Sequence, residues 1–222
     1  MELLAPAGSR QALTAAVQSG ADAVYLGGPQ FGARYSAENF TIEEMKTWVD
    51  YCHLYGVDVH VTINTLVKEK EFESLKEYLK QLNEIGVDAL IVQDMGAVEI
   101  IKKTVPDMTL HASTQMTVTS LEGVKYLENM GFSRVVLARE LSEKEIEHIC
   151  KNAKAEIEVF VHGAICMCYS GQCLMSSILG GRSGNRGRCA QPCRLPYDLL
   201  ENGKTVKSGY VLSPKDNHSD RK

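Results

Sequence analysis

The segment Gly20-Ala-Asp-Ala-Val-Tyr-Leu26 decides the fold, because its pattern is repeated along the chain. A glycine of the kind that ends helices is followed by a short β-branched or apolar run, and similar runs begin at Gly56, Gly86 and Gly131. Longer amphipathic stretches separate these runs. Short strand-like runs that alternate with longer helix-like ones are typical of a βα repeat, so the sequence predicts parallel strands with helices between them.

Seven segments have the composition of strands. They are Glu2 to Ala5, Ala23 to Leu26, Asp58 to Asn64, Ala89 to Gln93, Thr109 to Ser113, Arg134 to Ala138 and Glu156 to Val161. A (β/α)₈ barrel needs eight strands, and the only later strand-like run is Tyr210 to Leu212, after a turn at Asn202-Gly203. The predicted fold class is therefore α/β, a TIM-barrel-like (β/α) repeat that is incomplete at its C-terminal end.

The same count predicts the domain organisation. Residues 1–163 form the barrel portion with seven βα strands, and residues 164–222 form a cysteine-rich loop and the start of a truncated C-terminal part. We therefore expect the chain to be a fragment or a truncated reading frame. Helix starts support the repeat: Ser9 can cap the first helix, and Thr41 with Glu44 and Ser142 with Glu145 have the spacing of capping boxes.

The composition of the chain limits where the protein can be located in the cell and what it can bind. The 222 residues are 44% hydrophobic, which suits one domain with a sizeable core. The start of the chain has no signal-peptide pattern, and no apolar run approaches the ~20 residues of a membrane span, so we expect a cytoplasmic protein with no membrane partner. In that reducing compartment clustered thiols bind metal or do redox chemistry, whereas Cys52 and Cys150, alone in helical patterns, are predicted to be core residues.

The net charge of -4 provides no overall attraction to nucleic acid, so contact with RNA needs a local basic patch. One such patch is formed by Arg182, Arg186, Arg188 and Arg194. These arginines suit the phosphates of an RNA, and the alternative is an ordinary solvated basic loop.

Polar residues follow the predicted strands at their carboxyl ends, where barrels of this kind carry their chemistry. The candidates for catalysis are His111, Gln115, Arg139, Glu140 and His162, with Asn64 beside them. Taken singly, residues such as His111 or His162 are expected to be satisfied polar groups of barrel layers or turns. Their convergence at one face predicts a pocket for a polar or anionic small molecule.

Five of the seven cysteines lie in one loop after the last strand. They are Cys166, Cys168, Cys173, Cys189 and Cys193. The spacing lacks paired C-x₂-C knuckles, so zinc is less favoured than a 4Fe–4S cluster, which tolerates irregular spacing. Glycines near the thiols leave backbone amides free to hydrogen-bond sulfur. A free-thiol nucleophile is the weaker interpretation, because five cysteines are more than a nucleophile needs.

The residues around this loop resemble peptidase family U32. Its signature E-x-F-x₂-G-[SA]-φ-C-x₄₋₆-G-x-C-x-φ-S is matched by Glu158, Phe160, Gly163, Ala164, Ile165, Cys166, Gly171, Cys173, Met175 and Ser176. Blocks such as MELLAPAGS, GADAVYLGG, LHASTQM, VVLARELS and GRSGNRGRCAQPCRLPY also resemble the family, so that the likeness covers nearly the whole chain. The form of the last block is most similar to the long, RNA-hydroxylating branch.

The resemblance implies a TIM-barrel-like domain and two competing activities. The older family label is a collagenase-like protease. Better understood relatives are oxygen-independent hydroxylation proteins with a 4Fe–4S cluster. Some hydroxylate a tRNA wobble uridine using prephenate, one type makes 5-hydroxycytidine in 23S rRNA, and a paired type acts in anaerobic ubiquinone synthesis. A small organic acid and an RNA are thus the implied partners, with a peptide substrate as the alternative.

The residues favour hydroxylation over peptidase activity. A cysteine protease needs a thiolate with a base and an oxyanion hole, and a zinc protease would show a motif such as H-E-x-x-H. Neither is visible, although His162, four positions before Cys166, keeps a Cys–His dyad as an alternative. A non-catalytic metal-binding fragment is the third alternative.

The resemblance also implies the ligands. Cys166, Cys173 and one or both of Cys189 and Cys193 match family cysteines. In several relatives the fourth ligand lies near or beyond the Ser-Pro-Lys-Asp block at 213–216. We predict Cys166, Cys173, Cys189 and Cys193 as the ligand set, with Cys168 as the spare.

Overall fold

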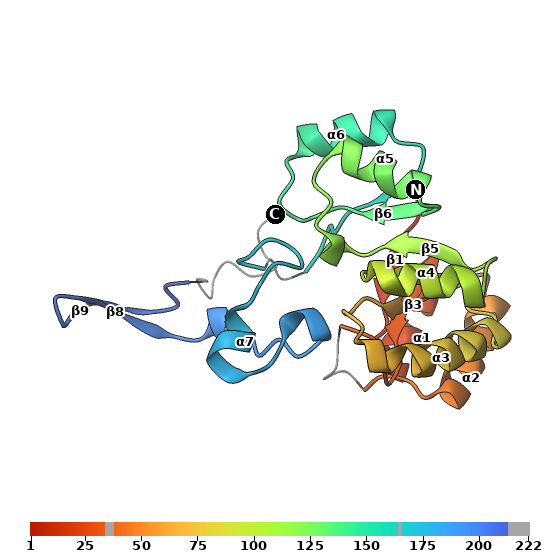
Figure 1. Ribbon diagram of the computed structural model, residues 1–222, viewed down its shortest axis with the longest axis horizontal. Helices are drawn as coiled ribbons and strands as arrows, with labels where there is room; N and C mark the ends of the chain where they lie inside the picture. The colour runs from red at the N-terminus through yellow and green to blue at the C-terminus, as the bar shows by residue number, and fades with distance from the viewer. Residues whose placement is uncertain (34–37, 164–165, 213–222) are drawn as a thin grey trace.

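A computed structural model describes residues 1–33, 38–163 and 166–212 of the chain. Its centre is a curled sheet of seven parallel strands that neighbour one another in chain order (Figure 1). The strands are β1 (Leu4–Pro6), β2 (Ala23–Gly27), β3 (Asp58–Ile63), β4 (Ala89–Val92), β5 (Thr109–Ala112), β6 (Arg134–Val136) and β7 (Glu156–Glu158). Within the described residues no strand joins β7 to β1. The predicted incomplete, TIM-barrel-like repeat is confirmed.

Helices connect the strands and lie on the outside of the curled sheet (Figure 1). They are α1 (Arg10–Gln18), α2 (Ile42–Leu54), α3 (Phe72–Glu84), α4 (Met95–Thr104), α5 (Leu121–Asn129) and α6 (Glu143–Asn152), with short 3₁₀ turns η1 (Glu69–Glu71) and η2 (Thr114–Met116). The predicted caps are confirmed. Ser9 accepts from the Ala12 amide, and both predicted capping boxes are formed.

The two faces of the sheet have different chemistry, because successive side chains of a strand point to opposite sides. The face toward the helices carries fully buried aliphatic residues such as Val59, Val61 and Leu90, which pack against helix residues such as Leu75 and Leu79. The inner face of the curl is polar toward the amino ends of the strands. This difference places the apolar core between strands and helices and leaves the inside of the curl for charged and polar groups.

Arg134 is the centre of the polar inner face. Its side chain is 9% exposed. The guanidinium donates to both oxygens of Glu2 at 2.6 Å, and its Nε and Nη2 donate to Glu156 at 2.8 and 2.5 Å. Glu2 precedes β1 and Glu156 lies in β7. Because β1 and β7 are the two edges of the open sheet, Arg134 links them across the inside of the curl without a backbone ladder between them.

The repeated aspartates of the Gly-x-Asp segments tie neighbouring strands at their amino ends. Asp22 accepts from the Leu3 amide at 2.7 Å, and Asp88 accepts from the Val59 amide at 2.7 Å. Each bond satisfies an amide beside the start of the preceding strand. The repeat visible in the sequence is therefore also a repeat of strand-end hydrogen bonds.

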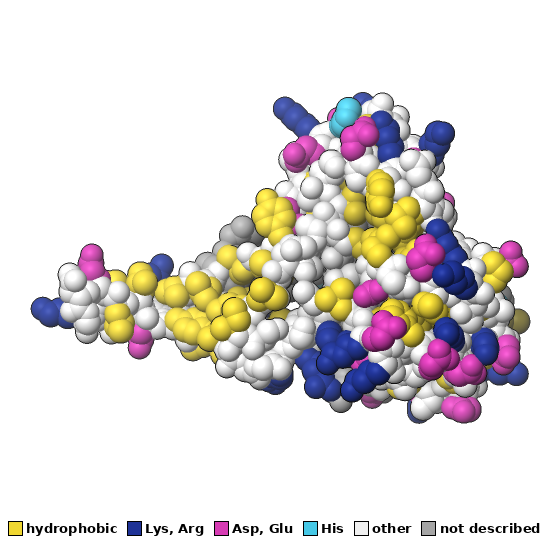
Figure 2. Space-filling model, in the orientation of Figure 1, with side chains coloured by type: hydrophobic (Ala, Val, Ile, Leu, Met, Phe, Trp, Pro, Cys, Tyr) yellow, Lys and Arg dark blue, Asp and Glu magenta, His cyan; other side chains and the backbone are white. Residues whose placement is uncertain are grey.

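An arm, residues 174–209, leaves the sheet after Cys173 and contains Cys189 and Cys193 (Figure 1). It contains α7 (Met175–Gly180), the 3₁₀ turns η3 (Gly184–Arg186) and η4 (Pro192–Arg194), and an antiparallel hairpin of β8 (Tyr197–Glu201) and β9 (Lys204–Gly209). Hydrophobic side chains run along its surface (Figure 2), among them Ile178, Leu179, Leu195, Leu199 and Val206.

Two expectations for single segments were wrong. Tyr210 to Leu212 is not a strand, because the hairpin ladder ends where Tyr197 pairs with Gly209. The predicted turn is present at Asn202 and Gly203, whose φ values of 50° and 77° suit a two-residue hairpin. The turn therefore joins the strands of the arm rather than supplying an eighth barrel strand.

Of the two isolated cysteines, Cys52 is buried as predicted, but Cys150 is exposed. Helix α6 buries Ile149 and leaves the next position toward solvent. The Ser-Pro-Lys-Asp block at 213–216 and the signature residues Ala164 and Ile165 lie outside the described residues. In the part of the chain that the structure describes, no helix is both long and apolar enough to cross a bilayer.

Arg134→Met should lower the free energy of unfolding by about 3 kcal/mol, because it leaves carboxylates without their cation. This is the lower end of the range for broken buried pairs, since Glu2 and Glu156 are partly exposed. Arg10→Met, which removes an exposed ion pair with Glu44, is the matched control and should cost about 0 to 1 kcal/mol. Urea unfolding of both variants measures the difference, and equal losses would contradict the linking role of Arg134.

Candidate functional site

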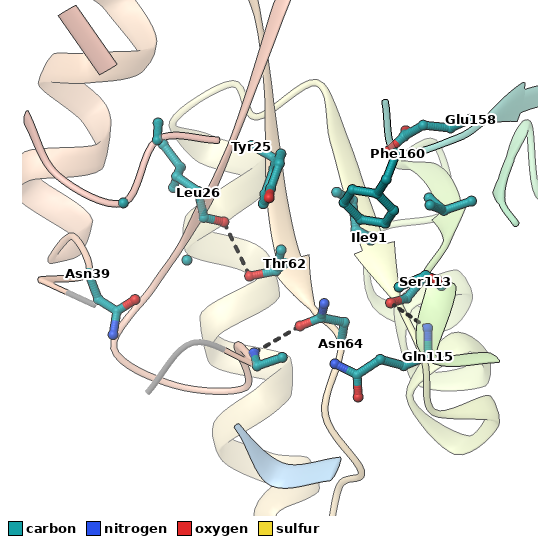
Figure 3. A pocket seen from close by; sticks show the side chains of 16 residues that line it. Tyr25, Leu26, Asn39, Thr62, Asn64, Ile91, Ser113, Gln115, Glu158 and Phe160 are labelled. Carbon is teal, nitrogen blue, oxygen red and sulfur yellow. Dashed lines mark hydrogen bonds between the residues drawn. The ribbon is translucent and has the colours of Figure 1, made fainter. Parts of the chain in front are cut away.

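A cavity of about 260 Å³ opens at the carboxyl ends of the strands. Its polar side chains include Thr62, Asn64, Ser113, Gln115 and Glu158, which come from β3, β5 and β7 or directly follow them (Figure 3). Ile91, Val136 and Phe160 supply apolar wall. The place matches the sequence expectation for barrels of this kind, and Asn64 and Gln115 are brought together there as predicted.

The polar wall residues are held by backbone groups. Asn64 accepts from the Ala33 amide at 2.9 Å through Oδ1, and its amide nitrogen points toward the cavity (Figure 3). Thr62 donates to the Leu26 carbonyl at 3.2 Å, and Ser113 accepts from the Gln115 amide at 3.2 Å. These bonds fix the orientation of the side chains, so that the cavity presents preset hydrogen-bonding groups.

Glu158 lies at the inner end of the cavity and was missed as a site residue by sequence reasoning, which used it only as part of the family signature. Its side chain is 19% exposed, and Oε2 is 3.8 Å from Arg134 Nη1. That oxygen is shielded from solvent and has no hydrogen-bond partner among the described residues. Burial raises the pKa of Glu158 to about 7, although Arg134 acts in the opposite direction.

A signal for Glu158 was present in the sequence. The segment Glu156-Ile-Glu-Val-Phe160 alternates acidic and apolar residues over a predicted strand, which places both acids on one face. Only the folded sheet shows that this face is the inside of the curl rather than solvent.

His111 lies on the same face of β5 as Ser113, two residues nearer the amino end, and the described wall of the cavity does not include it. Its ring meets His60 edge-on with centroids 4.7 Å apart, and both rings are buried. Burial lowers the pKa of His111 to about 3, with smaller contributions from His60 and Arg134. His111 is therefore a neutral ring of the barrel interior. The expectation that it would be a satisfied polar group is not met, because its Nδ1 is buried with no hydrogen-bond partner among the described residues.

Arg139 and Glu140 contact the cysteine loop, residues 166–193, rather than the described cavity wall. Arg139 Nε donates to Ser170 Oγ at 3.2 Å, and the Ser170 amide donates to Glu140 at 3.2 Å. Thr117 donates to the Ser170 carbonyl at 2.5 Å. Ser170 is 1% exposed, so these bonds hold a buried point of the loop. The remaining candidate, His162, is exposed.

Two glycines let the cysteine loop approach residues that line the cavity. A Cβ on Gly171 would lie 2.1 Å from the Gln115 carbonyl oxygen, and one on Gly187 would lie 2.6 Å from the Gly32 carbonyl oxygen and 3.0 Å from Ala33. Gln115 and Ala33 both line the cavity. The cysteine loop therefore packs directly against two residues of the cavity wall.

Arg186 fastens the same loop to the barrel. It donates to Glu71 with both terminal nitrogens, at 3.0 and 2.7 Å, and to the Leu66 carbonyl at 2.6 Å. The charge of Arg186 is thus neutralised by Glu71 within the protein. The prediction that Arg186 contacts RNA did not include this ion pair. A second cavity, of about 520 Å³, lies at this junction and is lined by Lys68, Arg186 and Arg188 among others. Figure 2 shows Lys and Arg side chains gathered between the arm and the barrel.

The thiols of the loop lie near one another. A Cβ on Gly184 would lie 3.7 Å from Cys189 Cβ and 3.9 Å from the Cys173 carbonyl oxygen. Burial raises the pKa of the Cys193 thiol, and the neighbouring Cys166, Cys189 and Cys173 thiols raise it further. Burial also raises the pKa of Cys168, with Cys173 and Cys166 adding to it. A backbone amide, that of Gln191, donates to Cys189 Sγ at 3.4 Å.

The described residues contain no group of three or more His, Cys, Asp or Glu side chains arranged to hold a metal ion. The thiols converge in one region without surrounding a single point. The predicted ligand set of Cys166, Cys173, Cys189 and Cys193 therefore stays a prediction.

Gly171→Ala should displace the cysteine loop, because Gln115 occupies the space that its Cβ needs. We expect it to lower the free energy of unfolding by about 1 to 3 kcal/mol more than Gly181→Ala. Gly181 is the matched control, since it has a similar positive φ, 64° against 75°, but nothing within 4 Å of its Cβ position. Urea unfolding and the alkylation rate of the loop thiols measure the effect, and equal behaviour of the two variants would show that the close approach is unimportant.

Glu158 should make stability depend on pH. Its folded pKa of about 7 exceeds the ordinary 4.5, so the folded state keeps a proton that the unfolded state loses as pH rises between these values. The wild type should therefore lose about 3 kcal/mol relative to Glu158→Gln across this window.

Urea unfolding at about pH 5 and about pH 8 measures this loss. Glu145→Gln is the control, because hydrogen bonds from Ser142 lower the pKa of Glu145, so that it is ionised in both the folded and the unfolded state and its contribution should stay nearly constant between these two pH values. A difference between the wild type and Glu158→Gln that does not change with pH would contradict the buried, protonated carboxyl.

The chain resembles known proteins over nearly all of its length. It is 45% identical over 219 residues to the 23S rRNA 5-hydroxycytidine C2501 synthase of Escherichia coli (strain K12), covering 98% of this chain and 33% of that protein. It is 40% identical over 223 residues to tRNA hydroxylation protein P1 of Bacillus subtilis (strain 168), covering 97% of this chain and 53% of that protein. The chain thus spans about a third to a half of the length of these relatives.

A solved structure supports the fold. The structure of the U32 peptidase Mk0906 matches with a TM-score of 0.62 at 20% identity, covering 74% of this chain and 70% of that one. The model of Peptidase family U32 matches residues 8–221. Because this match covers nearly the whole chain, including strands β2 to β7 and the cysteine loop, the chain belongs to peptidase family U32.

Proposed function

We propose that this chain acts in the hydroxylation of RNA, by iron–sulfur-dependent and oxygen-independent chemistry. The observation that carries the proposal is the 45% identity over 98% of the chain to a relative named as an rRNA 5-hydroxycytidine synthase. A second relative, at 40% identity, is named as a tRNA hydroxylation protein. Both matches include the cavity and the cysteine loop.

Cys166, Cys173, Cys189 and Cys193 are the proposed ligands of a 4Fe–4S cluster. Thiolates are the usual donors for such clusters, and the short distances from Gly184 to Cys189 and Cys173 support a shared site. The Gln191 amide already donates to a sulfur of this set, which is the kind of contact that tunes a cluster. When bound, the cluster would supply one-electron redox chemistry beside the cavity.

Residues of this chain would hold the cysteine loop beside the cavity and bind the RNA. Gly171 and Gly187 hold the thiols against Gln115 and Ala33, so a group bound in the cavity would lie beside the cysteine loop. Lys68 and Arg188, at the junction of loop and barrel, are the proposed contacts to RNA phosphates, together with Arg182 and Arg194. Because the net charge is -4, this local cluster must provide the attraction. A small organic acid such as prephenate is the proposed hydroxyl donor.

Peptidase activity has less support from the geometry. His162 is exposed, and among the described residues no hydrogen bond joins it to a thiol. The cavity is also small for an extended peptide, since ligand pockets commonly measure about 300–1,000 Å³.

Deletion of the gene should remove one hydroxylated nucleoside from rRNA or tRNA, and the wild-type gene should restore it. Cys173→Ser should fail to restore it and should lose most of the about four irons per chain that anaerobic reconstitution gives the wild type. Cys150→Ser, which changes an exposed thiol outside the loop, is the control and should retain both.

Nucleoside mass spectrometry and iron counting measure these effects. Unchanged RNA together with lost peptide cleavage in the deletion strain would overturn the proposed function in favour of a peptidase. Full iron content in Cys173→Ser, or stoichiometric zinc in place of iron, would overturn the ligand assignment.

A further inference from the structure

The charges around Glu158 favour its neutral form. Arg134 carries one positive charge and already faces two carboxylates, those of Glu2 and Glu156, with 2.5–2.8 Å hydrogen bonds. A third carboxylate 3.8 Å from the same guanidinium would leave the inside of the curl with two uncompensated negative charges. The two histidines that face this cluster do not supply a cation, because burial lowers the pKa values of both His60 and His111.

A neutral Glu158 is a hydrogen-bond donor at the inner end of the cavity. A protonated carboxyl has one O–H to donate, and no side-chain hydrogen bond joins Glu158 to another of the described residues. Oε2 is shielded and faces Arg134, so a ligand would meet the exposed part of the carboxyl, whose side chain is 19% exposed. With the carbonyl oxygen of the carboxyl toward Arg134 and its O–H toward the cavity, the ligand that suits the site carries an acceptor, such as a carbonyl oxygen.

The rest of the cavity suits a flat, uncharged ring. Phe160 and Ile91 provide apolar wall, while the Asn64 amide nitrogen and the Gln115 side chain point in from another side (Figure 3). The described lining contains no Lys or Arg, so it offers a carboxylate or phosphate neutral hydrogen-bond donors but no opposite charge. The volume of about 260 Å³ suits one ring rather than a peptide, and the prediction of a pocket for a polar or anionic small molecule stays a prediction.

We propose that the cavity receives a single nucleobase unstacked from RNA, and that neutral Glu158 donates a hydrogen bond to a carbonyl oxygen of that base. The inference rests on the proposed function and adds the site and the residue that read the base. Enzymes that modify bases commonly take them out of the stack into a pocket of apolar walls and edge-reading polar groups. Uracil, cytosine and guanine carry a ring carbonyl, whereas adenine does not, so adenine should be disfavoured.

The test measures binding of short single-stranded oligouridylate and oligoadenylate to the purified chain by fluorescence anisotropy. Phosphate contacts are common to both RNAs, so the ratio of their affinities reports the base site. At about pH 6 the wild type should prefer oligouridylate by about 10-fold, the value of one hydrogen bond to a buried group. Glu158→Leu should lose this preference while keeping its affinity for oligoadenylate.

Glu158→Gln keeps a neutral donor and should keep the preference within about 3-fold. The wild-type preference should also weaken as pH rises above 7, because Glu158 then ionises, whereas that of Glu158→Gln should not change. This second arm needs no disruptive substitution, so it remains decisive if Glu158→Leu folds poorly.

The outcomes separate the two proposals. An unchanged preference in Glu158→Leu, or a preference that does not respond to pH in the wild type, would overturn the role of Glu158 while leaving RNA hydroxylation in place. Absence of binding to either RNA, together with unchanged nucleosides in the deletion strain, would overturn both.

Discussion

The fold depends on one buried arginine that holds together the two edges of an open sheet. In the described part of the chain the parallel sheet has seven strands and curls without a backbone ladder between β7 and β1. Arg134 replaces that ladder with hydrogen bonds to Glu2 on one edge and Glu156 on the other. Bidentate geometry suits this task, because a guanidinium can face two carboxylates in fixed directions at once.

The same arginine has a consequence for the cavity. Its two close carboxylates use most of its hydrogen-bonding capacity, so the third, Glu158, lies 3.8 Å from the guanidinium at the inner end of the cavity without a hydrogen bond to it. Arg134 therefore accounts for two features: it links the edges of the sheet, and it leaves the Glu158 carboxyl without a hydrogen bond. Perturbed acids of this kind are common at functional sites, because an environment that favours the neutral form also makes the group a donor near neutral pH.

The cysteine loop and the cavity are joined by contacts that side chains would block. Gly171 and Gly187 approach carbonyl oxygens of residues at the cavity, and the bidentate Arg186–Glu71 pair adds a charged link. Ser170, held by Arg139, Glu140 and Thr117, is a further buried point of attachment. Arg139 and Glu140, predicted as catalytic residues, and Arg186, predicted to bind RNA, thus hold the cysteine loop in place. The cysteine loop is therefore packed against residues beside the cavity rather than being a separate module.

The sequence by itself determined the repeat, because strand and helix periods, helix caps and glycine stops are local properties. All seven strands and the three predicted caps follow from residues within a few positions of one another, and so does the Asn202-Gly203 turn. It also located the polar strand ends, including Asn64 and Gln115, since parallel strands bring their carboxyl ends to one edge.

Only the tertiary structure decided which polar residues face the cavity and which serve the fold. His111 and Glu158 are both polar residues on inward faces of strands, yet one is a buried neutral ring and the other lines the cavity. Arg186 belongs to a basic segment in the sequence, but Glu71, 115 positions away, matches its charge. The strand predicted at Tyr210 to Leu212 was wrong, because pairing with β8 sets where β9 ends, whereas the apolar residues of that segment do not. Burial and ion pairing between residues distant in the chain are properties of the folded molecule, so local patterns could not reveal them.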